Sequence, residues 1–418
     1  MGPIETRWRQ STSRRKAIAK LARLAAASPL FSSALSAQLD PRPLGEHKRT
    51  PGLDEMTNAF DFEPVMFANV PLTVYDYTAH GDGSEFTLRR NRQAFEWVDL
   101  VPGKAIDPAT VDLSCEVLGL KMKYPIMIAP TATMVPLHPD GEIGMHRAAT
   151  AASNTPMIVS HNTSTAIGRI AEGATGPLWW QFYPSQSLEA SREILDGAVT
   201  AGCTAIVVTV DQQASYYERS LQDRNLGGRS AGAGGGGRGG GAGGRGAAAP
   251  AGGPVSGPAR YRVSPGRLWY TWRYLDDLRK IVKVPMLVKG ILTAEDAKQC
   301  VDHGMDGVIV SNHGGRSMDY GPSTLEVLPE IVAVINGRIP VLTDSGYRRG
   351  SDILKALALG ANAVLLGRPT RWALAAFGTP GVERLLDMIQ RELVGAAAAA
   401  GRSTMASIDK SLVKANFT

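Results

Sequence analysis

Eight short apolar runs recur after about residue 120, and their order and spacing constrain the fold more than any other feature of the chain. Each run is apolar along most of its length instead of alternating with polar residues, which is typical of parallel strands buried on both faces. Segments with helical periodicity separate them, for example residues 294–303 and 351–359. The eight runs are residues 125–132, 155–160, 177–183, 205–211, 285–290, 307–313, 340–346 and 363–369.

The spacing of these runs fits a repeated strand–helix unit. Successive runs start about 22–33 residues apart, except that about 80 residues separate the fourth run from the fifth. Eight βα units in succession predict an α/β protein with a (β/α)8 barrel, the TIM barrel, and a long insertion after the fourth strand. A length of 418 residues with 44% hydrophobic residues suits one large barrel with extensions and excludes a disordered chain.

The remaining segments are assigned around the barrel. Residues 51–120, with a helical pattern over 56–69, are interpreted as an N-terminal cap packed on the barrel. The barrel itself takes residues 121–418 and ends in a long helix predicted over 381–400. Three cysteines in no CxxC pair predict neither a disulfide framework nor a zinc site, and no metal is expected.

Polar residues gather at the carboxyl ends of the predicted strands. Because the active site of a TIM barrel forms at that end, these side chains are expected to converge on one site. Capping and solvation explain any single one of them equally well, but not the whole set. They are Tyr183, Asp211, Lys289, His313, Asp344 and Arg368.

Two strand ends have the composition of a phosphate site. Gly346 with Arg348, and Gly367 with Arg368, offer open backbone N–H groups and guanidinium groups after strands seven and eight. Together with the cation Lys289 at the end of strand five, they predict a phosphorylated cofactor lying across the end of the barrel.

The sequence Ser-Asn-His-Gly-Gly-Arg at residues 311–316 places an imidazole and a guanidinium three residues apart on a glycine-opened loop. A near-neutral His313 can accept a proton, and Arg316 can bind a carboxylate through two parallel hydrogen bonds. The pair predicts a substrate with a reactive group next to its carboxylate.

The formal net charge of +6 is unevenly distributed along the chain. Residues 1–50 carry a net +7 and residues 224–275 a net +8, which leaves −9 for the rest. The basic charge is therefore peripheral, and the folded body is not expected to bind nucleic acid.

The insertion over residues 226–262 includes the stretch 227–246, in which thirteen of twenty residues are glycine. With so few core-forming side chains, it is expected to be a flexible, solvated loop over the end of the barrel. An RGG-type contact with nucleic acid through its arginines is the alternative interpretation.

The N-terminal segment 1–50 has two interpretations. Ser-Arg-Arg-Lys at 13–16, followed by a mildly apolar run over 17–31, resembles a twin-arginine export signal, which would place the protein in the periplasm. In the other interpretation, the segment is an extension without a targeting role, and the protein is cytoplasmic. No stretch reaches the roughly 18 apolar residues of a membrane span.

Several segments together resemble the FMN-dependent α-hydroxy-acid oxidases and dehydrogenases, the family of glycolate oxidase, lactate oxidase and mandelate dehydrogenase. The resemblance covers about residues 55–418, apart from the glycine-rich stretch. It lies in residues 75–77, 128–132, 181–183, 209–211, 287–296, 311–316, 338–350, 355–360 and 366–369.

The resemblance implies FMN as the cofactor and oxidation of an L-2-hydroxy acid to the 2-oxo acid, with electrons passed to oxygen, a quinone or a protein. It implies His313 as the catalytic base, oriented by Asp211, and a homo-oligomer, a tetramer in the family. The implied substrate-binding residues are Tyr77, Tyr183, Arg219 and Arg316. The implied cofactor-binding residues are Pro130, Thr131, Ala132, Ser160, Gln181, Thr209, Lys289, Ser311, Asp344, Gly346, Arg348, Gly367 and Arg368.

The chain departs from the family pattern at some positions. With the family's spacing counted from Thr209, the second substrate-binding arginine of the family would fall on Glu218. A one-residue insertion in this chain would place it at Arg219, and we prefer this assignment. Asn162 replaces the tryptophan of glycolate oxidases, so the size of the substrate stays open. Two alternative functions also stay open: an FMN-binding barrel of another activity, such as an isomerase, and a binding protein with basic arms on an inactive barrel.

Overall fold

The computed structural model describes residues 49–185, 187–211 and 271–417. The chain divides into two units, Met1–Thr50 and Pro51–Thr418, and the second contains the predicted cap and barrel. The possible export signal, the insertion over 226–262 and Arg219 lie outside the described residues.

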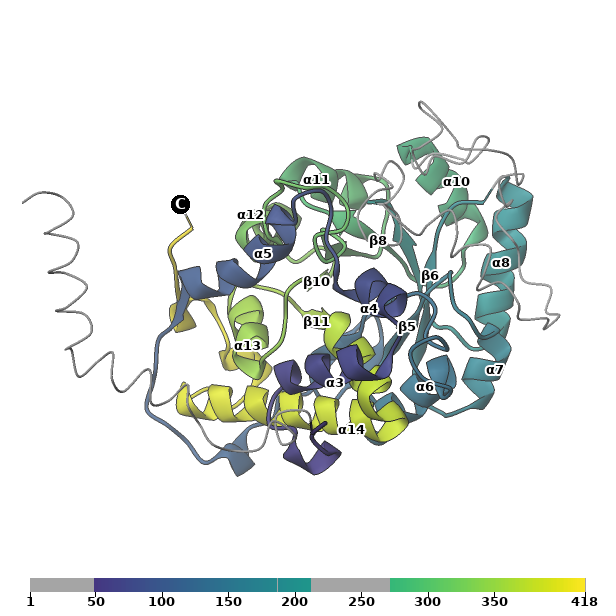
Figure 1. The fold of residues 1–418 in the computed structure, drawn as a ribbon. Helices are drawn as coiled ribbons and strands as arrows, with labels where there is room; N and C mark the ends of the chain where they lie inside the picture. The colour runs from purple at the N-terminus through teal and green to yellow at the C-terminus, as the bar shows by residue number, and fades with distance from the viewer. Residues whose placement is uncertain (1–48, 186, 212–270, 418) are drawn as a thin grey trace, which may run out of the picture. The chain divides into compact units, whose positions relative to one another are not determined.

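A closed barrel of eight parallel strands forms the centre of the unit Pro51–Thr418 (Figure 1). Each strand pairs with the next along the chain, and the last pairs with the first, Val364 lying opposite Ile126. All eight predicted runs contain a strand, which confirms the predicted TIM barrel. The strands are β4 (Ile126–Ile128), β5 (Met157–Val159), β6 (Leu178–Phe182), β7 (Ile206–Thr209), β8 (Met286–Ile291), β9 (Gly307–Val310), β10 (Val341–Thr343) and β11 (Ala363–Leu366).

Helices follow the strands and surround the barrel (Figure 1). Local capping fixes where several of them begin: the Thr293 hydroxyl accepts a hydrogen bond from the Asp296 N–H, and Ser323 forms a capping box with Glu326. These helices are α6 (Gly141–Ala151), α7 (Ile167–Glu172), α8 (Leu188–Thr200), α10 (Trp272–Ile281), α11 (Ala294–Asp302), α12 (Thr324–Ile335), α13 (Gly350–Ala358) and α14 (Arg368–Ala399).

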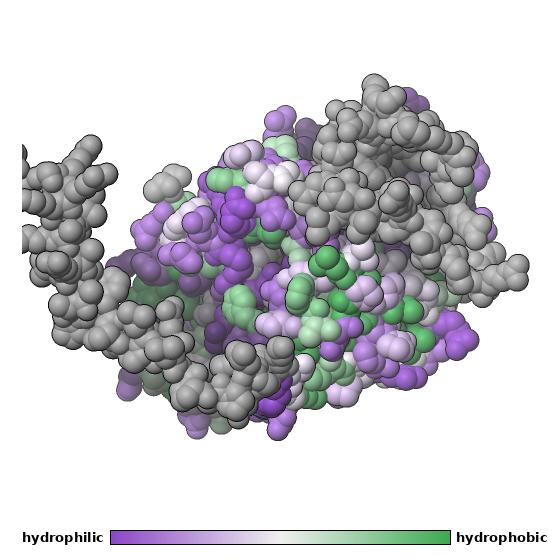
Figure 2. Space-filling view, viewed as in Figure 1, coloured by the Kyte–Doolittle hydropathy of each residue, from purple (hydrophilic) through white to green (hydrophobic). Residues whose placement is uncertain are grey.

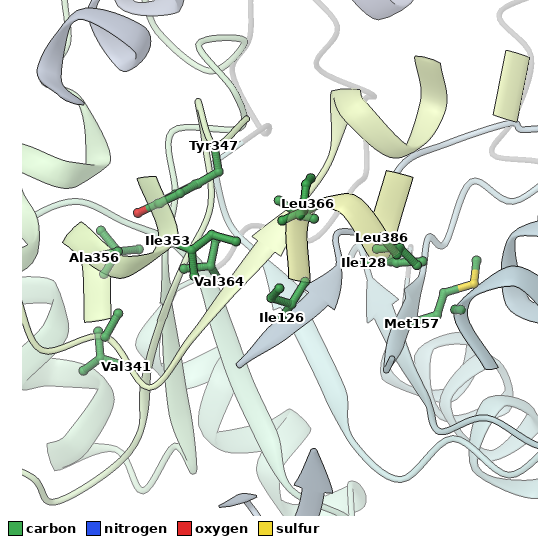
Figure 3. Packing of buried hydrophobic residues seen from close by; sticks show 14 of the residues in the cluster. Ile126, Ile128, Met157, Val341, Tyr347, Ile353, Ala356, Val364, Leu366 and Leu386 are labelled. Atoms are coloured by element: carbon green, nitrogen blue, oxygen red, sulfur yellow. The ribbon is translucent and has the colours of Figure 1, made fainter. Parts of the chain in front are cut away.

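The larger apolar core lies between the outer face of the barrel and the helices. Alternate residues of each strand face it, because successive side chains of a strand point to opposite faces. Figure 3 shows part of this layer, with Ile126, Val364 and Leu366 of neighbouring strands, Ile353 of α13 and Leu386 of α14.

A second, smaller apolar cluster fills the barrel interior. It includes Trp179 of β6 and Leu287 of β8, together with Val117 and Met122 of the hairpin formed by β2 (Cys115–Val117) and β3 (Leu120–Met122). The inside of the barrel is therefore a packed floor, and a ligand has room only at the strands' carboxyl ends.

Short helices precede the barrel and form the N-terminal cap. The predicted helix over 56–69 is split: a 3₁₀ turn, η3 (Ala59–Asp61), leads into α3 (Phe62–Asn69), because Asn58 and Asp61 form a capping box that starts the turn. α3 packs against α14. The further cap elements are η2 (Leu53–Glu55), α4 (Leu72–Ala79), α5 (Phe86–Gln93) and η4 (Ala94–Trp97).

The C-terminal segment is more extensive than the predicted helix. α14 begins at Arg368, directly after β11, and a kink at Phe377 and Gly378 divides it into two helices. Gly378 has a φ of 64°, and a Cβ there would lie 2.5 Å from His138, so a glycine is required. The chain ends in β12 (Val413–Ala415), which pairs antiparallel with β1 (Val98–Leu100).

The surface of the described unit is mixed in polarity. None of the described helices is long and apolar enough to cross a membrane. Figure 2 shows apolar side chains gathered on part of one face, and the large exposed apolar side chains include Phe67 of α3 and Leu72 of α4. Cys203 and Cys300 are buried, whereas Cys115 in β2 is only partly buried.

Candidate active site

A layer of mostly polar residues covers the apolar floor of the barrel. The uppermost apolar residues that face inward include Ile158, Trp179, Val207, Leu287 and Ile309. Two positions further along each strand, the side chain faces the same way again, but its chemistry changes. The residues at those positions, within or just after each of the eight strands, are all predicted cofactor residues: Thr131, Ser160, Gln181, Thr209, Lys289, Ser311, Asp344 and Gly367.

Several of these polar atoms are buried without a partner. Thr131 Oγ1, Gln181 Nε2 and Thr209 Oγ1 make no hydrogen bond among the described residues. Each such atom costs about 1–3 kcal/mol, so three in one place indicate a polar ligand. Gln181 is oriented for this: its Oε1 accepts from Ser160 Oγ at 3.2 Å, which leaves Nε2 for a ligand.

Lys289 supplies a buried cation in the same layer. Its side chain is held by Ser311 Oγ at 2.8 Å and by Asp344 Oδ2 at 3.4 Å from Nζ. The polar layer thus offers hydrogen-bond donors, acceptors and one cation to a flat polar ring system. The residues present therefore fit the flavin that the sequence implies. No group of three or more His, Cys, Asp or Glu side chains in the described ranges is placed to hold a metal ion.

His313 and Asp211 come together from the ends of β9 and β7. His313 Nδ1 lies 2.8 Å from Asp211 Oδ1, and the carboxylate is almost fully buried. Since the carboxylate accepts this hydrogen bond, Nδ1 carries the hydrogen and Nε2 is the basic nitrogen. This is the arrangement expected of a base and the residue that orients it.

Burial dominates the electrostatics of this pair. It lowers the pKa of His313, and the cations Lys289 and Arg316 lower it further, against the opposing effect of Asp211. Burial acts to raise the pKa of Asp211, but the charges of His313 and Lys289 hold it below its ordinary value. The pair therefore rests as a neutral imidazole and an ionised carboxylate.

The loop that carries His313 has a backbone that few sequences can adopt. His313, Gly314 and Gly315 have φ values of 58°, 69° and 75°, all in the left-handed region. A Cβ at Gly315 would lie 2.6 Å from the Leu88 backbone of α5, so the close approach of the cap requires glycine. A non-glycine residue held in this region is a form of strain that clusters at functional sites.

Arg316 and Tyr77 are also brought together. The guanidinium of Arg316 lies over the Tyr77 ring, 4.7 Å from its centre, and Nη1 donates to the Tyr77 carbonyl. Tyr183 follows β6, and its N–H donates to His161 Nδ1 at 3.2 Å. The fourth predicted substrate residue, Arg219, lies outside the described residues.

The predicted phosphate residues adjoin the cap. Gly346 has a φ of 97°, and a Cβ there would lie 2.5 Å from the Asn91 carbonyl. The Arg348 guanidinium lies 4.5 Å from the centre of the Trp372 ring, and Nη1 donates to the Tyr347 carbonyl. Burial lowers the pKa of Arg348 to about 10.

Arg368 has a second task that the sequence did not indicate. Its guanidinium donates to the carbonyls of Thr78, His80 and Gly314 at 2.7–2.8 Å, and so joins the cap to the His313 loop. Three of its five N–H groups are used, which leaves two for a phosphate. Burial, followed by the charges of Arg316 and Arg348, lowers its pKa to about 9, so this is a position that favours an anion.

Some residues at the site were missed by sequence reasoning. The Asn91 and Asn312 amides exchange hydrogen bonds of 2.9 and 2.8 Å, and Asn312 Oδ1 also accepts from the Gly315 N–H, which fixes the loop. Only Asn312 lay in a recognised motif. Arg371 Nη1 donates to the carbonyl of Ala132, which follows Pro130 and Thr131 after β4. No sequence signal pointed to Arg371, because the helix was predicted only over 381–400, whereas α14 begins at Arg368.

Comparison with known proteins agrees with this geometry. The model of the family described as FMN-dependent dehydrogenase matches residues 67–415. The chain belongs to this family. Members of the family use FMN, and the match favours 2-hydroxy-acid chemistry over the isomerase and binding-protein alternatives.

Relatives within the family are similar over nearly their whole length. A peroxisomal (S)-2-hydroxyacid oxidase of Arabidopsis thaliana is 37% identical over 363 residues, which cover 87% of this chain and 97% of the relative. The glycolate oxidase of Spinacia oleracea is 35% identical over 374 residues, with the same coverage. A crystal structure of mandelate oxidase with (S)-2-phenylpropionate has a TM-score of 0.72 at 33% identity and covers 84% of this chain and 97% of that one.

Proposed function

We propose that this FMN-dependent enzyme oxidises an L-2-hydroxy acid to the 2-oxo acid with His313 as the base. The observation that carries the proposal is the 2.8 Å contact of His313 Nδ1 with Asp211 above the polar layer of the barrel. Family membership supports the cofactor and the class of substrate. The residues that would hold FMN are those of the polar layer, with Gly346, Arg348 and Arg368 at its phosphate.

The chain's own residues would bind the substrate and move its proton. Arg316 binds the substrate carboxylate through charge-assisted hydrogen bonds, and Tyr77, over which Arg316 lies, shares this contact. His313 Nε2 takes a proton from the substrate, and Asp211 stabilises the imidazolium that forms. When bound, FMN supplies the acceptor for the two electrons and the second proton that the substrate loses. Lys289 places a positive charge in the layer where the ring would lie.

The pH dependence of kcat/KM tests the role of His313. Since its pKa is lowered by burial, the active neutral form prevails at neutral pH, and kcat/KM should fall only as the pH drops through that pKa, below 6.5. Asp211→Asn removes an influence that raises the pKa, so the fall should move to still lower pH. The measurement is kcat/KM with saturating FMN across this range. A midpoint clearly above 6.5 would contradict the assignment.

We also propose oxygen as the electron acceptor, supported by relatives that are named oxidases. Turnover in air should then consume one oxygen and form one hydrogen peroxide for each 2-oxo acid produced. An oxygen electrode together with a peroxide assay measures this ratio. Turnover that occurs only with an added quinone or dye, and without oxygen uptake, would identify a dehydrogenase.

Assembly into a homo-oligomer stays a prediction.

A further inference from the structure

Arg371 is a buried arginine whose role the mechanism does not use. It lies in the first turn of α14, and only 4% of its surface is exposed. Nε donates to Thr78 Oγ1 at 3.0 Å, and Nη1 donates to the Ala132 carbonyl. These two bonds place the guanidinium between the cap and the loop after β4, directly beside the candidate site.

The guanidinium of Arg371 shares an aromatic ring with the substrate arginine. It lies 5.6 Å from the centre of the Tyr77 ring, and the Arg316 guanidinium lies 4.7 Å from the same centre. Both cations therefore border the same tyrosine ring at the candidate substrate site. Arg316 is one of the influences that lower the pKa of Arg371, after burial.

Arg371 forms hydrogen bonds with neutral groups but no direct ion pair among the described residues. Both hydrogen-bond acceptors are neutral, and three of its five N–H groups have no acceptor among the described residues. The buried carboxylate of Glu142 acts on the charge of Arg371 without a direct ion pair, because its oxygens accept from Met134, Ser164 and Thr165 instead. A buried, unpaired charge is costly, which makes it an unusual choice for a purely structural link. Thr78 and Ala132 would accept hydrogen bonds equally well from an uncharged donor.

The other cations of the site already have assigned anions. The phosphate of FMN accounts for Arg348 and Arg368, the substrate carboxylate accounts for Arg316, and Lys289 has Asp344 at 3.4 Å. Among the cations that the structure describes at this site, Arg371 is the one that remains, on the Tyr77 side where the substrate would bind. A second negative charge on the substrate would balance it.

We infer that Arg371 forms a second anion subsite, so that the preferred substrate is an L-2-hydroxy acid with a second carboxylate, a short 2-hydroxy dicarboxylate. This inference rests on the proposed function. Arg316 binds the carboxylate next to the reacting carbon, and Arg371 binds the distal one. Asn162, which replaces a tryptophan of the glycolate oxidases, is consistent with a site that takes a larger and more polar substrate.

Matched substrates test the charge and leave the size unchanged. The wild-type, FMN-loaded enzyme is assayed with four- and five-carbon L-2-hydroxy dicarboxylates and with the distal monoamide of each. We expect kcat/KM to be about tenfold or more higher for at least one diacid than for its amide, since a charge-assisted pair is lost in the amide. Equal values for both pairs would overturn the inference, and this comparison needs no variant.

The variant Arg371→Met then assigns the effect to this side chain. In this variant, kcat/KM for the diacid should fall about tenfold or more relative to a small 2-hydroxy monocarboxylate measured on the same variant, so that the diacid and its amide become equal. Arg371→Lys, which keeps the charge, should retain part of the preference. An equal loss for diacid, amide and monocarboxylate would show that Arg371 only supports the structure.

Binding gives a readout that does not depend on turnover. Calorimetry with the 2-oxo diacid and its distal amide should show the same preference in the wild type and none in Arg371→Met. The outcomes also separate the two proposals. If monocarboxylates reduce the flavin and diacids are not preferred, the inference fails alone; if no L-2-hydroxy acid reduces it, the proposed function fails.

Discussion

Replacing His313 with Gln is expected to slow reduction of the bound flavin at least about 10²-fold, which is the contribution of a positioned base. Glutamine keeps the size and the hydrogen-bonding capacity of the side chain, but it cannot accept the proton. Substrate affinity should change far less, because Arg316 and Tyr77 stay in place. The measurement is the rate of flavin reduction by an L-2-hydroxy acid in an anaerobic single-turnover experiment, monitored through the flavin absorbance.

The neighbouring His161 provides a matched control. It follows β5 at the same end of the barrel, but its Nδ1 accepts a hydrogen bond from the Tyr183 N–H, whereas Nδ1 of His313 donates to Asp211. In neutral His161 the hydrogen is therefore on Nε2, and that nitrogen is not a base. His161→Gln should reduce the flavin much faster than His313→Gln. Reduction of His313→Gln at nearly the wild-type rate would remove His313 as the base.

Replacing Arg368 with Ala is expected to weaken FMN binding about 100-fold or more and also to destabilise the protein before any FMN binds. The first effect follows from two lost charge-assisted bonds to the phosphate. The second follows because the carbonyls of Thr78, His80 and Gly314 lose their donor, at a cost of about 2–4 kcal/mol in all. Flavin content after dialysis and urea unfolding of the FMN-free protein measure the two effects.

Arg348→Ala separates these effects. Arg348 donates to the carbonyl of its neighbour Tyr347 and lies over Trp372, so these contacts do not join the cap to the His313 loop. Its loss should weaken FMN binding with a much smaller change in the unfolding free energy of the FMN-free protein. Full flavin occupancy in Arg368→Ala, or equal stabilities of the two FMN-free variants, would refute the double role of Arg368.

The barrel was predictable because it depends on a regular pattern, whereas most members of the polar layer were identified through the family resemblance. Fully apolar runs at regular intervals specify parallel strands. Because side chains two positions apart on a strand face the same side, Gln181 faces inward like Trp179, and Lys289 faces inward like Leu287. The family resemblance gave roles to those positions. The contact of His313 with Asp211, 102 residues apart in the chain, follows once the strand ends are known to meet.

Contacts between the cap and the barrel were not predictable in this way. Whether Arg368 faces backbone carbonyls as well as a phosphate, or whether Asn91 reaches Asn312, depends on how two separately patterned regions pack together. No spacing rule relates residues that lie 221 positions apart on different elements. The same reason applies to Arg371, which on α14 alone looks like an ordinary helix residue.

The bonds from Arg368 and the asparagine pair have a consequence for protein engineering. The left-handed loop of His313 is held from outside the barrel, by residues of the cap that precede the first barrel strand. Transplanting β4 to β11 with their helices onto another protein would carry the side chains proposed for catalysis but not their placement. The smallest unit that can be moved, shuffled or split with its chemistry intact therefore begins with the cap helices.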